Sequence, residues 1–316
     1  MTGDAETLVS PGLRPEVLGD AAQRQTKALV HAALFKGTGE APTIGPYRVL
    51  TRLGEGGMGV VYAAYDDTLE RKVALKLLRG AIVRRPEGRV RTLREARALA
   101  RLSHPNVVHV YQVGEVDDEV FVAMEFLTGP TLRAWLKGQP RTWREVLAVF
   151  RQAGEGLAAA HRQGVIHRDF KPANVIVGDD GRVRVLDFGL AHFGDDRGAT
   201  AALSAAGEPT DVLRTQTGAV LGTPAYMAAE QFAGARGDAR TDQFSFCTAL
   251  YEALYGQRPF AGDTLAALVP AVTTGRIEPV KAGRDVPAWL HRVVVRGLQP
   301  DPAQRLPGTV LPRFAE

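Results

Sequence analysis

Alternating apolar and polar positions mark the first half of the chain. The alternation runs through residues 47–67 and 71–80, and it returns on both sides of the turn at Asp117-Asp118. Between these runs, residues 86–103 have helical spacing and place their apolar side chains on one face. A period of two is typical of β-strands. The pattern therefore predicts an antiparallel, strand-rich lobe with one main helix.

The second half has the longer period of α-helices. Helical spacing covers residues 131–138, 143–164 and 241–256. One short hairpin interrupts this half, with the β-branched run Val175–Val177, a Gly-Asp-Asp-Gly turn and a second apolar run that ends at Leu186. We expect an α+β fold of two lobes, a small antiparallel β-rich lobe with one main helix and a larger α-helical lobe.

The domain boundaries follow the same changes of pattern. Residues 1–46 are polar and punctuated by proline and glycine, and they predict a flexible extension and linker with one amphipathic helix at 21–35. The strand-rich lobe is expected over residues 47–127 and the helical lobe over residues 128–316. No internal repeat is visible in the sequence.

Composition excludes several classes of protein. With 316 residues, 45% of them hydrophobic and 23% charged, the chain can bury a large core. No apolar run is long enough to span a bilayer, the N-terminus lacks the pattern of a signal peptide, and a single cysteine excludes an internal disulfide framework. These features favour a cytoplasmic protein. The net charge of +4 is spread along the chain without a basic-aromatic pattern, which argues against a nucleic-acid partner.

Residues capable of catalysis flank the hairpin. Before it come His167, Arg168, Asp169, Lys171 and Asn174, and directly after it comes Asp187. Because a hairpin brings its two ends together, Asn174 and Asp187 should lie near each other. Their oxygens suit Mg²⁺ with an attached phosphate, which leaves Asp169 to accept a proton. For His161 and His167 a structural role is favoured over a metal site, since no cysteine or third histidine accompanies them.

The glycine-rich stretch GEGGMG at residues 54–59 has several interpretations. A dinucleotide-binding fold needs such glycines to open a helix, but here a strand pattern follows them. The phosphate loop of nucleoside triphosphatases needs Gly-Lys-Ser/Thr, which is absent. A hairpin that closes over a polyphosphate remains, and so does an ordinary glycine-rich hairpin. Lys76 on the next strand has apolar neighbours, so we expect it to pair with Glu95 and with phosphates, unless its stem carries it to the surface.

Six motifs together carry a family resemblance. In chain order they are GEGGMGVV, VALK, REARAL, HRDFKPAN, DFG and GTPAYMAAEQ. Their order and spacing match the protein-kinase signature set. From Tyr47 to its end, the chain resembles a bacterial, eukaryotic-like serine/threonine protein kinase. The resemblance implies transfer of the γ-phosphoryl group of ATP to Ser or Thr hydroxyls of protein substrates.

The resemblance implies a nucleotide site built from both lobes. Val61 and Ala74 would lie above the adenine and Ile176 below it, while the backbone of Glu125 and Leu127 would bind its edge. The expected nucleotide-binding residues are Leu53, Gly54, Glu55, Gly56, Gly57, Met58, Gly59, Val60, Val61, Ala74, Lys76, Glu125, Leu127 and Ile176.

The resemblance also implies the catalytic roles. Lys76 would hold the α- and β-phosphates and be positioned by Glu95. Asp169 would orient and deprotonate the substrate hydroxyl, and Lys171 would neutralise charge on the transferred group. A loose phosphoryl-transfer transition state needs such positioning and charge neutralisation.

The cofactors implied are ATP and Mg²⁺, with Mn²⁺ as a substitute, and Asn174 and Asp187 would hold the metal ion. The alternative is a nucleotide-binding scaffold that recruits partners and has lost catalysis. Such scaffolds usually lack the lysine, the base or a metal ligand. All of these are present here, so an active kinase is favoured.

Four residues are implied in substrate choice and regulation. Thr223 resembles the threonine that braces the catalytic loop of serine/threonine kinases. Arg168 would join a basic pocket for a phosphorylated residue of the activation loop, and Thr215 and Thr217 are the best-placed acceptors. We therefore expect activation by autophosphorylation, in trans within a homodimer, as part of a bacterial signalling pathway.

Three more residues are implied in the architecture of the large lobe. Asp242 would anchor the backbone of the catalytic loop, although it could simply cap a helix. Glu230 is expected to pair with Arg305. Ala229 replaces the proline of the family motif, and Cys247 replaces a glycine. The sequence ends shortly after Arg305, so the closing helix of the large lobe is expected to be missing, which would expose apolar surface.

Overall fold

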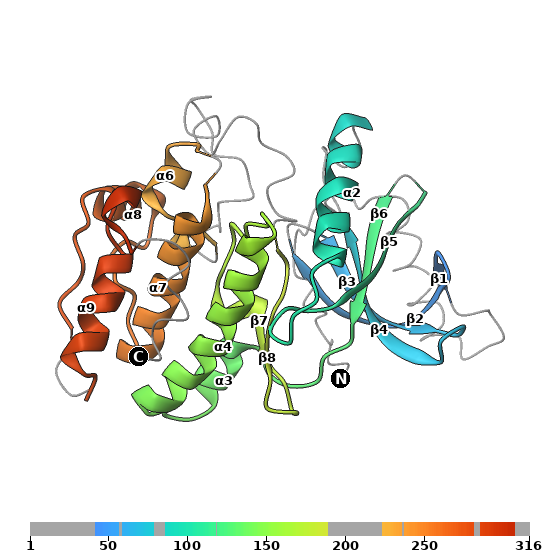
Figure 1. The fold of residues 1–316 in the computed structure, drawn as a ribbon, viewed down its shortest axis with the longest axis horizontal. Helices are drawn as coiled ribbons and strands as arrows, with labels where there is room; N and C mark the ends of the chain where they lie inside the picture. The colour runs from blue at the N-terminus through green and yellow to red at the C-terminus, as the bar shows by residue number, and fades with distance from the viewer. Residues whose placement is uncertain are drawn as a thin grey trace, which may run out of the picture.

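The chain folds into two lobes, a small one built on a β-sheet and a larger one built mainly of helices (Figure 1). The computed structural model describes residues 42–56, 59–78, 86–117, 119–188, 223–235, 237–280 and 285–306. The helix expected at 21–35 lies outside these residues. Within them, the predicted α+β fold of two lobes is confirmed.

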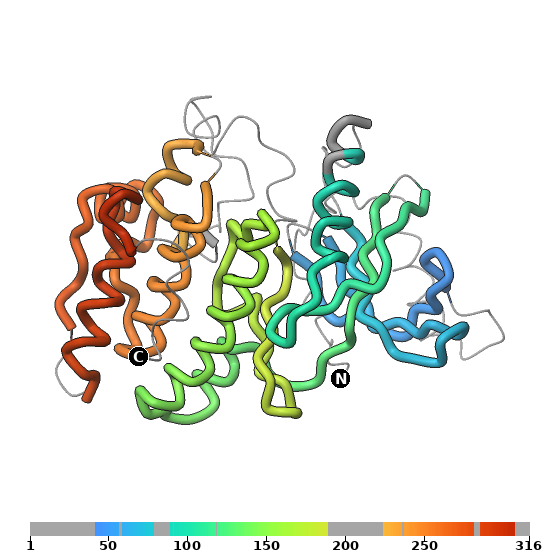
Figure 2. The backbone as a smooth tube through the Cα atoms, in the orientation of Figure 1, coloured from blue at the N-terminus to red at the C-terminus, as the bar shows by residue number. Residues whose placement is uncertain are grey.

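The small lobe contains a six-stranded antiparallel sheet with the order β1-β2-β3-β4-β6-β5. One helix, α2, packs against β5 and β6 at one edge of this sheet (Figure 2). The bounds are β1 Thr43–Ile44, β2 Tyr47–Gly56, β3 Gly59–Asp66, β4 Arg71–Leu78, α2 Pro86–Ala100, β5 Val110–Val116 and β6 Glu119–Glu125. The short strand β1 was not expected from the sequence; the other strands and α2 were.

The two faces of this sheet bury different residues. On β4, Val73, Leu75 and Leu77 belong to a cluster on the outer face of the sheet. Because successive residues of a strand point to opposite faces, Lys76 shares the inner face with Ala74. Strand register therefore turns Lys76 toward the space between the lobes.

A short linker after β6 connects the lobes and also pairs with the large lobe. The carbonyl of Thr128 accepts a hydrogen bond from Asp179 N–H at 3.1 Å, and the carbonyl of Pro130 accepts one from Val177 N–H at 3.0 Å. Between them, Gly129 has a φ of +122°, and a Cβ there would lie 2.3 Å from the carbonyl oxygen of Val177. Only glycine fits this conformation and this close approach.

The large lobe consists of helices and one small hairpin, β7–β8, that lies against α4 (Figure 1). No described helix combines the length and the apolar character that crossing a membrane requires. The bounds are α3 Leu132–Gly138, α4 Trp143–Arg162, η1 Pro172–Asn174, β7 Val175–Val177, β8 Val183–Val185, η2 Thr223–Tyr226, α6 Ala229–Phe232, α7 Ala239–Tyr255, α8 Leu265–Thr273, α9 Ala288–Gly297 and η3 Pro302–Gln304. Helices α6, α8 and α9 were not expected from the sequence.

Helix α7 runs through the centre of the large lobe. Its polar residues Thr241, Asp242, Gln243 and Ser245 are buried together with its apolar ones. Such a helix has no solvated face and therefore lacks a clear amphipathic pattern. Its Phe246 ring lies 5.3 Å from Phe150 of α4 and 5.5 Å from Phe170. Phe170 belongs to residues 167–174, the expected catalytic loop, so α7 packs against this loop.

Helices α7 and α9 approach closely where Cys247 faces Gly297. A Cβ on Gly297 would lie 2.2 Å from the Cys247 Sγ. The Cys247 thiol is thus accommodated by a glycine on the neighbouring helix. Cys247 is fully buried, and burial raises the pKa of its thiol to about 12.

Candidate active site

Lys76 is buried and paired with a carboxylate from the other lobe. Its Nζ lies 2.8 Å from Oδ1 of Asp187, which follows β8. An unpaired buried ammonium group is very costly, so a partner was expected. The partner is Asp187, however, and not Glu95 as the sequence suggested.

Asp187 sits at a sharp bend directly after the hairpin. Its φ of +59° is in the left-handed region, which is uncommon for an aspartate. Burial alone would raise the pKa of this carboxyl group, but the charge and hydrogen bond of Lys76 outweigh burial and hold the pKa below its ordinary value. Asp187 is therefore an anion at neutral pH.

Asp169, Lys171 and Asn174 are held together on the catalytic loop. Lys171 Nζ lies 2.8 Å from Asp169 Oδ2. The Asn174 amide donates from Nδ2 to the Asp169 carbonyl at 2.9 Å and to Asp169 Oδ2 at 3.3 Å. Asp169 is almost fully buried, so these donors compensate for its lost hydration. The structure thus brings two of the expected catalytic residues and one expected metal ligand together.

Asp242 on α7 anchors the backbone of this loop, as the resemblance implied. It is fully buried and accepts hydrogen bonds from the backbone N–H of His167 at 2.7 Å and of Arg168 at 2.6 Å. The His161 ring donates from Nε2 to Asp242 Oδ2 at 2.6 Å, since a carboxylate can only accept. His161 therefore has the structural role that its sequence context favoured.

His167 joins the catalytic loop to the segment that carries Asp187. Its Nδ1 accepts from the Asp169 N–H at 3.3 Å, so its Nε2 carries the hydrogen and donates to the Leu186 carbonyl at 2.7 Å. Its ring packs 4.7 Å from the ring of Phe188. Because one buried residue bonds to both segments, the two sides of the site are positioned relative to each other.

Packing requires glycine at only some positions of the β2–β3 hairpin. At Gly59 a Cβ would lie 2.0 Å from the Leu77 carbonyl oxygen, so the fold itself requires glycine. At Gly54 and Gly56 a Cβ would meet no described atom within 4 Å, so internal packing does not explain these two residues. The neighbouring Leu53 is half exposed despite being apolar. These features fit a hairpin that covers a ligand.

One expected residue of this hairpin, Val60, does not face Lys76. Val60 pairs with Leu77 and is buried in the outer cluster, so its side chain points away from Lys76. This orientation disagrees with its expected role as a nucleotide-binding residue. Glu55 forms an ion pair with Arg52 within the hairpin. Gly57 and Met58 lie outside the described residues.

The expected adenine-binding residues come from three segments. Val61 pairs directly with Lys76 across the sheet, and Ala74 pairs with Met124, so both lie on the inner face. From the large lobe, Ile176 forms an isolated bridge with Thr131, just past the linker. Val61 and Ala74 thus share the inner face with Lys76, and Ile176 lies at the start of the large lobe beside the linker.

The end of β6 has the open backbone groups that an adenine edge would need. The Glu125 N–H already donates to the His109 carbonyl at 2.8 Å. Just past the strand, the N–H and the carbonyl of Leu127 make no backbone hydrogen bond among the described residues. These groups can bind the edge of a planar base.

A family model for the protein kinase domain matches residues 47–310. The match covers most of the chain and includes every site residue described above. The chain belongs to the protein kinase family.

Relatives of this kinase are bacterial. It is 36% identical over 267 residues to the serine/threonine-protein kinase PknE of Mycobacterium bovis, covering 84% of this chain and 44% of the relative. It is 37% identical over 268 residues to PknD of Mycobacterium tuberculosis, covering 83% and 38%. The chain therefore spans less than half the length of these relatives. Among solved structures, the PknI kinase domain of Mycobacterium tuberculosis matches with a TM-score of 0.64 and 28% identity, over 88% of this chain and 97% of that one.

Protein kinases use ATP and a divalent metal ion, and the donor atoms near Asp187 fit such an ion. Asn174 turns its amide nitrogen toward Asp169, so its oxygen is left free to bind a cation. Leu186 N–H donates to the Asn174 carbonyl at 2.9 Å, which places Asn174 beside Asp187. One amide and one carboxylate oxygen suit a hard cation that also binds phosphate oxygens. Among the described residues, no group of three or more His, Cys, Asp or Glu side chains forms an alternative metal site.

Glu95 of this kinase lies against the catalytic loop. Its Oε2 is 3.5 Å from a guanidinium nitrogen of Arg168, while Lys76 is held by Asp187. The prediction that Glu95 positions Lys76 is therefore wrong for this conformation. Arg168, with a φ of +64°, also has a buried Nε that finds no acceptor among the described residues.

Of the remaining expected residues, Glu230, Arg305 and Thr223 lie within the described part of the chain. Arg305 is buried and forms a bidentate pair with Glu230, at 2.7 and 2.8 Å, as expected. Thr223 begins the turn η2. Thr215 and Thr217 lie outside the described residues.

Gln231 was missed by the sequence reasoning. It follows Glu230 on α6, is buried, and donates from Nε2 to the carbonyl of Arg168 at 3.0 Å. Its place directly after Glu230 in the GTPAYMAAEQ motif was the available signal. A glutamine on a helix, however, is usually solvated. Its contact depends on the approach of α6 to the catalytic loop.

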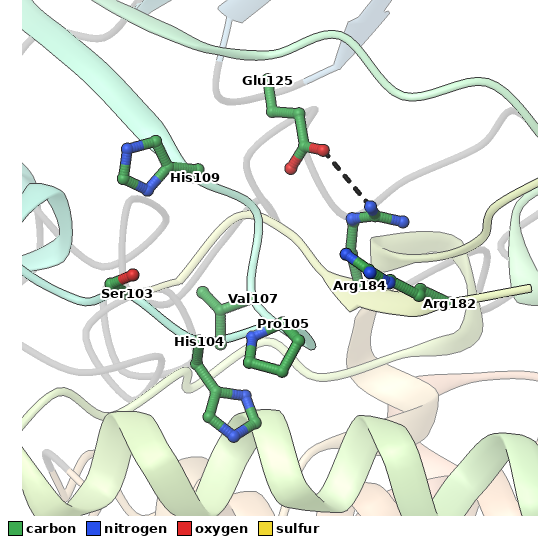
Figure 3. A pocket seen from close by; sticks show the side chains of 8 residues that line it. All are labelled: Ser103, His104, Pro105, Val107, His109, Glu125, Arg182 and Arg184. Carbon is green, nitrogen blue, oxygen red and sulfur yellow. Dashed lines mark ion pairs between the residues drawn. The ribbon is translucent and has the colours of Figure 1, made fainter. Parts of the chain in front are cut away.

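A cavity of about 210 Å³ lies beside the linker between the lobes (Figure 3). Arg184 of β8 and Glu125 of β6 both line it, and their side chains form an ion pair of 3.4 Å across the lobes. Arg184 is also held by Asp180, at 2.7 and 2.9 Å. The pair ties the end of β6 to the hairpin of the large lobe. The cavity contains none of the expected catalytic residues.

Proposed function

We propose that this protein is an ATP-dependent serine/threonine protein kinase that transfers the γ-phosphoryl group of ATP to Ser or Thr hydroxyls of proteins. The observation that carries the proposal is the convergence of Asp169, Lys171 and Asn174 with the Lys76–Asp187 pair from across the cleft. A metal-binding pair, a phosphate-binding amine and a separate base are the parts that phosphoryl transfer requires.

In this proposal each residue has one role. Asp169 accepts a hydrogen bond from the substrate hydroxyl and takes its proton as the bond to phosphorus forms. Lys171 stabilises negative charge on the transferred group. Lys76 binds the α- and β-phosphates, and Asn174 and Asp187 would hold Mg²⁺ or Mn²⁺. Such an ion would neutralise negative charge on the phosphate groups.

The test is phosphate transfer from labelled ATP with Mg²⁺ to a generic basic protein. We expect label on Ser or Thr, and a loss of at least a hundredfold in Asp169→Asn. The matched control is Asp179→Asn, which changes an exposed aspartate in the β7–β8 turn and should retain activity. No transfer by the wild-type chain, with ATP still bound, would favour the scaffold alternative.

We further propose that phosphorylation of Thr215 or Thr217 activates the enzyme by capturing Arg168. The support is that Arg168 is held by only one carboxylate contact at 3.5 Å and has a buried Nε without an acceptor among the described residues. A phosphate dianion binds arginine more strongly than a single carboxylate oxygen at that distance. Its arrival would release Glu95 to pair with Lys76.

Autophosphorylation can be tested separately from catalysis. Incubation with ATP should add phosphate to the segment containing Thr215 and Thr217, detected by intact mass and peptide mapping. The initial rate should rise faster than linearly with enzyme concentration if the reaction occurs in trans within a homodimer. An unchanged mass after incubation, with an active enzyme, would refute this regulation and leave the kinase assignment intact.

A further inference from the structure

Gln231 bonds with both ends of its amide group to two different segments. Its Oε1 accepts from the Ala228 N–H at 2.9 Å, which caps the short helix α6. Its Nε2 donates to the Arg168 carbonyl at 3.0 Å, on the catalytic loop. The side chain is 6% exposed, so neither bond is replaced readily by water. The first bond is local, whereas the second joins residues 63 positions apart.

The peptide groups on both sides of Arg168 are held by side chains. Its N–H donates to Asp242 Oδ1 at 2.6 Å, and its carbonyl accepts from Gln231. Arg168 has a φ of +64°, a conformation that a non-glycine residue keeps only where its surroundings impose it. The carbonyl carbon of Arg168 is bonded directly to the nitrogen of Asp169. Orientation of this peptide plane therefore determines where the Asp169 carboxylate points.

We propose that Gln231 is a positioning residue for phosphoryl transfer, which acts by fixing the Arg168–Asp169 peptide plane. Asp242 fixes the preceding peptide from α7, and Gln231 fixes this one from α6. Without the Gln231 donor, the part-buried Arg168 carbonyl loses this partner and the strained conformation loses one of its restraints. The inference rests on the proposed role of Asp169 as the base.

Two substitutions separate the positioning role from helix capping. Gln231→Met keeps the length of the side chain and removes both hydrogen bonds. Gln231→Glu keeps an oxygen that can accept from the Ala228 N–H but replaces the donor to the Arg168 carbonyl. If capping alone mattered, the glutamate variant would behave as wild type.

Gln243 provides a matched control on α7. It is also buried and also uses both ends of its amide on backbone groups, accepting from Leu306 N–H at 3.1 Å and donating to the Leu306 carbonyl at 3.3 Å. Among the described residues this amide bonds to Leu306, which lies outside the catalytic loop. Gln243→Met should therefore cost comparable stability without changing the geometry around Asp169.

The measurements are kcat, KM for ATP, KM for a peptide substrate, and the thermal midpoint of each full-length variant. We expect about a tenfold fall in kcat for Gln231→Met and Gln231→Glu with both KM values unchanged, because one misoriented hydrogen bond costs about one power of ten in rate. Gln243→Met should keep its kcat while losing a similar amount of thermal stability. A wild-type kcat in Gln231→Glu, or equal kcat losses in Gln231→Met and Gln243→Met, would overturn the proposal.

The double variant Asp169→Asn/Gln231→Met distinguishes failure of this proposal from failure of the proposed base. If Gln231 acts through Asp169, the double variant should be no slower than Asp169→Asn alone. An additional tenfold loss in the double variant would contradict the proposal. High activity of Asp169→Asn would instead refute the base assignment. If Gln231→Met lacks a cooperative unfolding transition, Gln231→Glu, which keeps the cap, decides the question by its kcat alone.

Discussion

Two arginine–glutamate pairs in this kinase have the same chemistry and different surroundings. Arg305 and Glu230 lie within the large lobe, 2.7 Å apart, with side chains 0% and 15% exposed. Arg168 and Glu95 join the lobes, 3.5 Å apart, with side chains 21% and 35% exposed. The first pair is dry and bidentate. The second is partly hydrated, and its carboxylate–guanidinium contact is longer.

The neighbours of each pair explain what it can do. Arg305 also donates to the carbonyls of Gln299, Arg240 and Pro300. With the two bonds to Glu230, all five N–H groups of its guanidinium have an acceptor. Glu230 also accepts from Thr241. A pair bonded on every side has no alternative partner, whereas an arginine with one long carboxylate contact, as in Arg168, can exchange it. Burial and additional hydrogen bonds thus make Arg305–Glu230 a structural pair, whereas the Arg168–Glu95 pair can change partners.

Removal of Arg305 should give the largest effect. Arg305→Met leaves Glu230 buried without its cation and three carbonyls without a donor, so the free energy of unfolding should fall by about 3–5 kcal/mol. Urea denaturation measures the loss. Arg292→Met, which changes an exposed arginine on α9, is the control and should stay within about 0.5 kcal/mol of wild type. Equal effects of the two substitutions would show that the Arg305 network is not structural.

Overpacking next to this region should give the second largest effect. Gly297→Ala places a methyl group 2.2 Å from the Cys247 Sγ, so α7 and α9 must move apart, at a cost of about 1–3 kcal/mol in unfolding free energy. Cys247→Ala in the same chain should restore part of the loss, because it removes the clashing sulfur. Gly138→Ala, where a Cβ meets nothing within 4 Å, should be neutral or stabilising. Destabilisation by Gly138→Ala as large as by Gly297→Ala would contradict the packing argument.

Acid should weaken the Arg305–Glu230 pair in a defined direction. Burial would raise the pKa of Glu230, but its hydrogen bond to Arg305 and the arginine charge outweigh burial and hold the pKa below its ordinary value. The pair therefore contributes fully above the ordinary glutamate pKa of about 4.3 and loses its contribution as the pH falls through the lowered folded-state pKa. The stability difference between wild type and Glu230→Gln should shrink with acidification, measured by urea denaturation at several pH values. A stability difference between wild type and Glu230→Gln that grows as the pH falls would contradict this prediction.

Much of the fold was predictable because the small lobe has a clear period of two. The strands β2 to β6 followed directly from alternation. The buried face of α2, with Ala96 and Leu99, followed from helical spacing. Helix α9 was not predicted, and β1 is only two residues long. The buried polar residues of α7 show why pattern alone is weak in a lobe centre, where hydrogen bonds rather than water satisfy polar groups.

The candidate site was predictable as a set of residues, and less so as a set of contacts. The motifs brought Asp169, Lys171 and Asn174 together, as the structure does. The need of Lys76 for a carboxylate also followed from its apolar neighbours. Which carboxylate it binds depends on how closely α2 approaches the sheet, and no spacing in the sequence encodes that distance. Gln231 was missed for the same reason, since its partner lies on a distant segment.

The smallest change in stability and the sharpest change in function should come from Glu95. Because its contact with Arg168 is partly hydrated, Glu95→Gln should alter the free energy of unfolding by no more than about 1 kcal/mol. If Glu95 exchanges from Arg168 to Lys76 in the active state, the same substitution should lower kcat by about tenfold or more. The matched control is Glu115→Gln, whose glutamate contacts Arg89 at the same 3.5 Å and should leave both quantities unchanged. A stability loss like that of Arg305→Met would make the Glu95 pair structural, and an unchanged kcat would mean that Glu95 never serves Lys76.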